Sequence, residues 1–149
     1  MKLKLTECPE LPELEVEIRY AKLTSQVQSL AKKIAQSEKY LHGEEGGRQY
    51  RILVDDIFYI ESMERKTFIY TDRAIFRAEQ KLYQLLDMLQ GTDFVQVSKS
   101  CIVNINVIDS MQSLANSRLQ ATLANGEKVN VSRTFLPQIK AAFTGKEND

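Results

Sequence analysis

The sequence has few of the residues that bind metal ions or form disulfides. It contains one histidine, His42, and two cysteines, Cys8 and Cys101, which are far apart and in no CxxC pair. Structural zinc sites usually take four ligands of these two types, so we expect no metal site and no cofactor. A disulfide is not expected in a reducing compartment. We interpret Cys101 as a small core residue and Cys8 as incidental.

Long apolar runs are also absent. No stretch approaches the roughly 18 consecutive apolar residues that a membrane-spanning helix needs. The first seven residues, MKLKLTE, reach an acid before any apolar core of a signal peptide can form. We therefore expect the protein to stay in the cytoplasm.

The motifs that mark common active sites are missing as well. No GxSxG, P-loop or GxGxxG sequence occurs, and the single histidine lies among glycines. The pair Asp55-Asp56 stands between two predicted strands, where such residues usually form a turn through side-chain-to-backbone hydrogen bonds. We expect a protein that is not an enzyme.

The composition that remains suits one ordinary domain with a small appendage. The chain has 149 residues, of which 43% are hydrophobic, enough for a real core. Twenty Lys and Arg balance twenty Asp and Glu. Residues 48–143 carry 12 cations and 10 anions, a net charge of only +2. Any binding to nucleic acid must then depend on a few well-placed cations rather than on a general positive field.

The first 41 residues predict a small β-β-α segment. Residues 14–20, LEVEIRY, alternate apolar and charged side chains, as a strand with one solvated face does. After residue 22 the apolar side chains recur at helical spacing, with Thr24 or Ser25 as a possible N-cap. That helix either packs on its own strands or shares its small core with a second copy, and we predict a homodimer through residues 1–41.

The remaining boundaries follow from glycine and from β-patterning. Residues 42–47, HGEEGG, predict a Gly-rich linker, and residues 144–149 a short tail. Between them, residues 48–143 read mainly as strands. A helix with an apolar stripe over residues 82–89 ends at Gly91. Asn125-Gly126 is typical of a tight hairpin, and a short last helix is expected at residues 135–143. The sequence thus predicts a mainly β, antiparallel domain with one or two helices.

Three blocks of this domain carry a family resemblance. Residues 54–62 read VDDIFYIES, residues 94–104 read FVQVSKSCIVN, and residues 123–136 read LANGEKVNVSRTFL. In content, order and spacing they resemble the LytTR-type DNA-binding domain of bacterial LytR/AlgR-class regulators. The sequence departs from that pattern at Gln96, Ser98 and Cys101, where the family commonly has arginine, histidine and an aromatic residue.

The resemblance implies an elongated antiparallel β fold and a sequence-specific transcription regulator. Such a protein places loop and strand-end residues in successive major grooves of double-stranded DNA. Carried over by position, the implied DNA-binding residues are Arg133, then Ser98 and Lys99, then Arg65, Lys66 and Thr67. On residue type alone, Arg133 could also be an ion-pair partner, and Lys99, Arg65 and Lys66 could also be solvated surface charges.

Two further expectations depend on the same resemblance. The 47 residues before the domain are too few for a phosphorylatable receiver, so the chain resembles short stand-alone regulators. Such regulators are often paired with a small membrane protein that restrains them. The alternative reading is a β-rich protein-interaction module that retains the LytTR core with little DNA affinity. The near-zero net charge and Ser98 favour that alternative.

Overall fold

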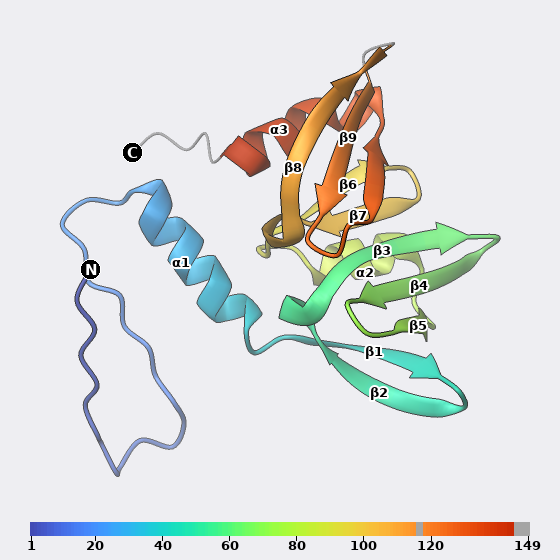
Figure 1. Cartoon of the computed structure of the whole chain (residues 1–149). Helices are drawn as coiled ribbons and strands as arrows, with labels where there is room; N and C mark the ends of the chain where they lie inside the picture. The colour runs from blue at the N-terminus through green and yellow to red at the C-terminus, as the bar shows by residue number, and fades with distance from the viewer. Residues whose placement is uncertain (116–117, 145–149) are drawn as a thin grey trace.

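The computed structural model describes residues 1–115 and 118–144, and in them the chain forms two antiparallel sheets and three α-helices (Figure 1). The helices are α1 (Ser25–Gln36), α2 (Leu82–Met88) and α3 (Leu136–Thr144). The strands are β1 (Tyr40–Glu45), β2 (Arg48–Leu53), β3 (Ile57–Met63), β4 (Lys66–Thr71), β5 (Ile75–Ala78), β6 (Phe94–Ser98), β7 (Cys101–Asn104), β8 (Ile108–Leu114), β9 (Arg118–Leu123) and β10 (Lys128–Val131). The predicted mainly β, antiparallel fold is confirmed.

The two sheets enclose two hydrophobic cores. The larger sheet has the strand order β2-β1-β5-β4-β3-β7-β6, and the smaller has the order β10-β9-β8. One core lies between the larger sheet and α2, and the other between β6 and β7, the smaller sheet and α3. Strand β7 is buried on both faces: Ile102 belongs to the first core, and Cys101 and Val103 belong to the second. The expectation that Cys101 is a core residue is therefore confirmed.

Several local predictions are confirmed in their geometry. Gly91, just after α2, has a φ of +82°, and Gly126, in the hairpin between β9 and β10, has a φ of +88°. Both values lie in the left-handed region, which glycine enters without strain. Asn104 is buried and has a structural role: its Nδ2 donates to the carbonyl of Ile57 and its Oδ1 accepts from the backbone N–H of Asn106.

The N-terminal segment differs from the prediction. Residues 14–20 lie in no strand, and their side chains are mostly exposed. A strand needs a neighbour for its backbone hydrogen bonds, and within the described part of the chain none pairs with this segment. The helix is confirmed as α1, with the Thr24 hydroxyl accepting from the backbone N–H of Val27.

The predicted linker at residues 42–47 is wrong. Residues 42–45 belong to β1, and Gly46 and Gly47 form the turn into β2, with φ values of +59° and +81°. Gly43 faces the core, where a Cβ would lie 2.6 Å from the Cβ of Phe76 in β5. This glycine therefore permits close packing of two strands and does not interrupt structure. Of the predicted tail, Thr144 ends α3, and residues 145–149 lie outside the described residues.

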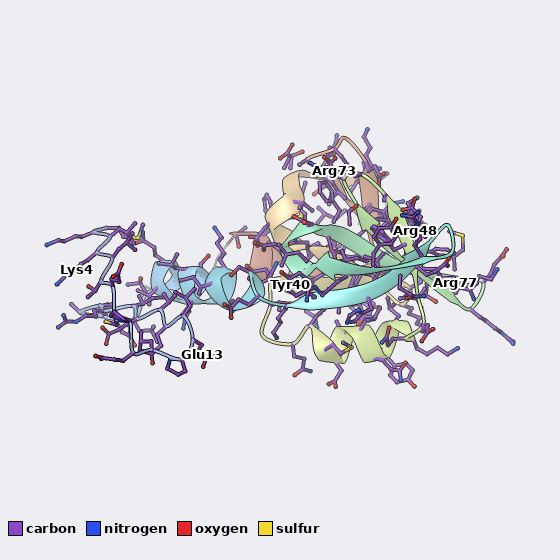
Figure 2. The ribbon with its side chains drawn as sticks, turned by 90° about the horizontal axis from the view of Figure 1, so that it is seen from below. Lys4, Glu13, Tyr40, Arg48, Arg73 and Arg77 are labelled. Carbon is purple, nitrogen blue, oxygen red and sulfur yellow. The ribbon has the colours of Figure 1, made fainter. Side chains whose placement is uncertain are left out.

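Helix α1 is fixed to the domain by one buried side chain. Gln36, fully buried at the end of α1, donates from Nε2 to Oδ1 of Asp55 at 3.0 Å. Its Oε1 accepts from the backbone N–H of Asp93 at 3.1 Å. Both halves of the amide are therefore satisfied without water. Ahead of this point, α1 and the N-terminal segment extend away from the sheets (Figure 2).

The contact at Gly43 gives a stability prediction. Gly43→Ala should lower the free energy of unfolding by about 1–3 kcal/mol, because the new methyl group must displace the side chains of Phe76 and Ile52. The exposed neighbour His42, changed to alanine, is the matched control. Urea denaturation followed by circular dichroism measures both. Equal midpoints for the two variants would show that Gly43 is not closely packed.

Candidate nucleic-acid interface

The turn between β6 and β7 carries Ser98 and Lys99. The backbone N–H of Ser100 donates to the Ser98 hydroxyl at 3.2 Å, so the Ser98 side chain closes the turn. Lys99 is exposed at the tip of this turn. A serine suits this position as a turn-forming residue, and the cation beside it is presented to solvent.

Two backbone hydrogen bonds bring neighbouring segments against this turn. The N–H of Ser62, near the end of β3, donates to the carbonyl of Ser100 at 2.7 Å. The N–H of Ser132, just after β10, donates to the carbonyl of Val97 at 2.8 Å. The end of β3, the β6–β7 turn and the chain leaving β10 therefore lie side by side, although they are far apart in the sequence.

Arg133 begins a single 3₁₀ turn, Arg133–Phe135, directly after that second hydrogen bond. Its backbone is held by β10 on one side and α3 on the other. The side chain is exposed and borders an open hollow of about 550 Å³ that also contacts Arg118 and Lys140. Arg118, at the start of β9, also lines a groove with Ser98. Three cations from distant parts of the sequence thus gather near the β6–β7 turn.

Sequence reasoning missed Arg118 and Lys140. Neither lies in one of the three family-like blocks, and no local pattern distinguishes them from surface charges. Only the packing of β9 and α3 beside residue 133 brings them there.

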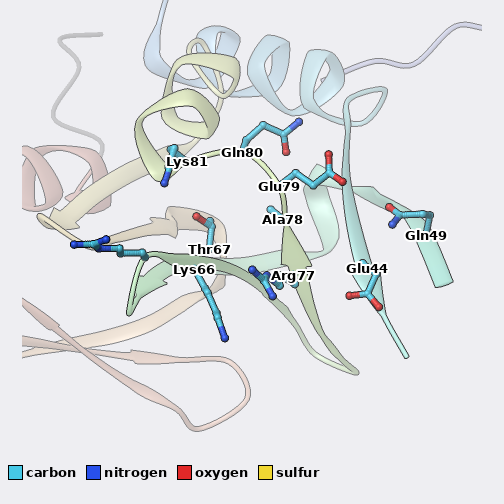
Figure 3. A pocket seen from close by; sticks show the side chains of 10 residues that line it. Glu44, Gln49, Lys66, Thr67, Arg77, Ala78, Glu79, Gln80 and Lys81 are labelled. Carbon is cyan, nitrogen blue, oxygen red and sulfur yellow. The ribbon is translucent and has the colours of Figure 1, made fainter. Parts of the chain in front are cut away.

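The turn between β3 and β4 holds Arg65 and Lys66 at the other end of this surface. Glu64 and Arg65 have φ values of +52° and +66°, the paired left-handed geometry of a tight two-residue hairpin. Non-glycine residues adopt it only when the flanking strands hold them. Both cations are exposed. They also border a hollow of about 480 Å³ with Arg77 and Lys81, in which Lys66 and Lys81 point to opposite sides of the sheet (Figure 3).

Thr67, predicted as a DNA contact, does not belong to the exposed set. Its side chain is only 4% exposed. In β4 the buried positions alternate, and Thr67 shares the core-facing side with Ile69. The turn ends at Lys66, so the next residue already follows the strand pattern and points inward.

The groove between the two sheets contains groups that stay neutral. It is lined by Tyr59, Glu61, Ser98, Cys101 and Arg118, among others, and holds about 440 Å³. Burial, with a smaller effect of Glu61, raises the pKa of the Cys101 thiol to about 12. Burial and a hydrogen bond to Glu127 raise the pKa of Tyr59. The groove thus offers a cation, hydroxyls and the Glu61 carboxylate, and the Cys101 thiol in it is not ionised at neutral pH.

The aromatic residues beside this groove join the two sheets. Tyr59 stacks on Tyr70 with ring centroids 4.2 Å apart, and its hydroxyl bonds Glu127 in the β9–β10 turn. This contact supports the smaller sheet at the end opposite to Ser132.

In the described part of the chain, no helix is both long enough and apolar enough to cross a membrane.

Known proteins resemble this chain in sequence and in fold. The sequence model of the LytTr DNA-binding domain matches residues 47–144. The chain is 31% identical over 93 residues to the sensory transduction protein LytT of Enterococcus faecalis, which covers 62% of this chain and 38% of that protein. It is 29% identical over 128 residues to LytT of Bacillus anthracis, covering 86% of this chain and 48% of that protein.

A solved structure supports the fold assignment. A LytTr DNA-binding domain from Bacillus cereus superposes with a TM-score of 0.66 at 19% identity, covering 70% of this chain and 96% of that one. At this identity the likeness shows the fold alone. The chain spans less than half the length of the two LytT proteins.

The two cysteines should differ sharply in reactivity. Cys8 is exposed, whereas Cys101 is buried and its pKa is raised to about 12, so at pH 8 its thiol stays protonated and is shielded from reagents. Iodoacetamide followed by mass spectrometry should find one labelled thiol per native chain and two in denaturant. Fast labelling of Cys101 in the native protein would show that the groove admits small molecules to the thiol.

Proposed function

The chain belongs to the LytTr DNA-binding domain family, and we propose that it is a sequence-specific transcription regulator that reads successive major grooves of double-stranded DNA. The observation that carries this proposal is the pair of hydrogen bonds from Ser62 and Ser132 to the β6–β7 turn. They align three cationic segments on a domain of a DNA-binding family. Base reading requires side chains on a fixed backbone, and these bonds hold the backbone at the contact points.

Each exposed candidate has a role that its chemistry suits. Arg133 offers a planar guanidinium that can take O6 and N7 of a guanine, so we assign it base reading. Lys99, at a turn tip, suits a phosphate, as do Arg65 and Lys66 on the next turn. Ser98 is engaged in its own turn, and its hydroxyl can still donate to a phosphate or a base edge. Arg118 and Lys140 extend the cationic surface around Arg133.

We further propose that the protein forms a homodimer through residues 1–41 and binds DNA as that dimer. Helix α1 has apolar residues at helical spacing, among them Val27, Leu30 and Ile34, and these are only partly buried in the single chain. A dimer would present two copies of the cationic surface to two half-sites. Sedimentation at tens of micromolar tests this part separately from DNA binding, and a monomer there would contradict it.

Selection of bound duplexes from a random pool tests the proposed function directly. A regulator of this kind should enrich one motif, and its affinity should fall steeply as that motif is changed. Recovery of no motif, together with weak binding that does not depend on sequence, would favour a protein-interaction module instead.

Lys99→Ala should weaken binding to all sequences alike. If Lys99 neutralises one phosphate, its removal should reduce the slope of log K against log salt by about 1. Fluorescence anisotropy at several salt concentrations measures the slope. Lys32→Ala, on the exposed face of α1, is the control and should leave it unchanged. An unchanged slope in the Lys99 variant would remove this residue from the phosphate contacts.

Arg133→Ala should cost about 1–3 kcal/mol of binding to the best site and relax preference at one base pair. Arg133→Lys should recover only part of this, because an ammonium cannot make two parallel bonds. Thermal unfolding should change little, since the side chain is exposed. Full specific binding by the alanine variant, or a large loss of stability, would instead indicate that Arg133 has a structural role.

A further inference from the structure

The N-terminal segment has a two-faced strand pattern, and within the described residues most of its apolar side chains are exposed. Leu14, Val16 and Tyr20 are 79%, 57% and 54% exposed, and they alternate with charged residues. Figure 2 shows the segment beyond α1, away from the sheets, with Glu13 labelled there. Such a stripe of large apolar side chains usually marks a contact surface.

The larger sheet ends in an open edge at β2. Within the described residues, β2 pairs with β1 alone, so its other edge offers unpaired backbone groups. On one face of β2, Tyr50 and Ile52 point toward the core side, and Tyr50 packs on Phe76 with ring centroids 5.3 Å apart. On the other face, Arg51 lies over the ring of Tyr40 at 4.4 Å.

A groove runs beside this edge. It holds about 440 Å³ and is lined by residues of β2, by the start of β3 and by the β4–β5 turn. Its apolar members are Tyr50, Ile52, Leu53, Phe58, Ala74 and Phe76. The edge thus has free hydrogen-bonding groups, and the groove beside it combines these apolar side chains with charged ones, Arg51 among them.

We propose that residues 14–20 of a second copy add to β2 as an extra strand. This inference rests on the homodimer proposed above and identifies its contact. Side chains of a strand alternate with period two, so the apolar face of the segment can lie on the groove while its charged face, which carries Glu15, Glu17 and Arg19, lies beside Arg51. With Val16 and Ile18 beside Tyr50 and Ile52, Glu17 lies beside Arg51 in either strand direction.

The geometry of α1 favours a second copy over the chain's own segment. Gln36 fixes the end of α1 to Asp55 and Asp93, and the helix of 12 residues then extends for about 18 Å. Residues 21–24 leave five Cα–Cα steps between Tyr20 and the start of α1, which together span at most about 18 Å, no more than the length of the helix. The chain's own segment would have to run fully extended back along α1 to reach its own β2 edge, whereas two copies related by a twofold axis can exchange segments.

Cross-linking between two differently marked copies tests this contact. In a Cys8→Ser background, Glu17→Cys chains are mixed with Arg51→Cys chains and oxidised mildly without DNA. The mixture should give a disulfide dimer joining the two kinds of chain, identified by mass spectrometry. Glu7→Cys mixed with Arg51→Cys is the control and should give far less, because residue 7 lies about 33 Å further along an extended strand.

A charge exchange provides a second readout. Glu17→Arg should weaken the dimer about fivefold in sedimentation, and adding Arg51→Glu in the same chain should restore it. The inference is overturned by a cross-link within one chain when both cysteines are present together. It is also overturned by a stable dimer that gives no 17–51 cross-link, a result that leaves the dimer itself and DNA binding intact.

Discussion

Strand β7 is the element on which the rest of the domain depends, because both of its faces are buried. Ile102 contributes to the core under α2, while Cys101 and Val103 contribute to the core under the smaller sheet. A strand between two cores cannot shift without disturbing both, since protein interiors are closely packed. The β6–β7 turn ends where this strand begins, so the position of the turn is set by packing. The hydrogen bonds from Ser62 and Ser132 then hold the end of β3 and the chain after β10 against this turn.

Much of this domain could be predicted because its signals are local. The α2 stripe, the Asn125-Gly126 hairpin and the family-like blocks all depend on residues close together in the sequence. The packing role of Gly43 could not be predicted that way, because the residue that leaves no room for a Cβ there is Phe76, which is 33 positions later. Thr67 was expected in the exposed turn, whereas it lies in strand β4. Moving the boundary between turn and strand by one residue moves a side chain from the exposed face of a strand to the buried face. Arg118 and Lys140 join Arg133 only through tertiary packing.

The near-neutral charge of the chain is compatible with a cationic interface because the cations are concentrated at turns and strand ends. Residues 48–143 carry only two more cations than anions, yet Lys99, Arg118, Arg133 and Lys140 lie near one end of the sheets. A weak overall field gives little long-range attraction to DNA, so discrimination between sequences must depend on contacts at short range. The Ser98 hydroxyl accepts a hydrogen bond from the backbone of Ser100 and so fixes the turn that carries Lys99.

The buried amide of Gln36 makes α1 a rigid arm. Its two hydrogen bonds reach the 3₁₀ turn before β3 and the residue that precedes β6, so the helix cannot tilt without leaving polar groups unpaired inside the protein. Residues that α1 carries are therefore held at a fixed angle to the strands that bear the cationic turns. In any assembly built through the N-terminal segment, this angle sets the distance between the two cationic surfaces. That distance in turn would select the spacing of the half-sites that both surfaces can occupy together.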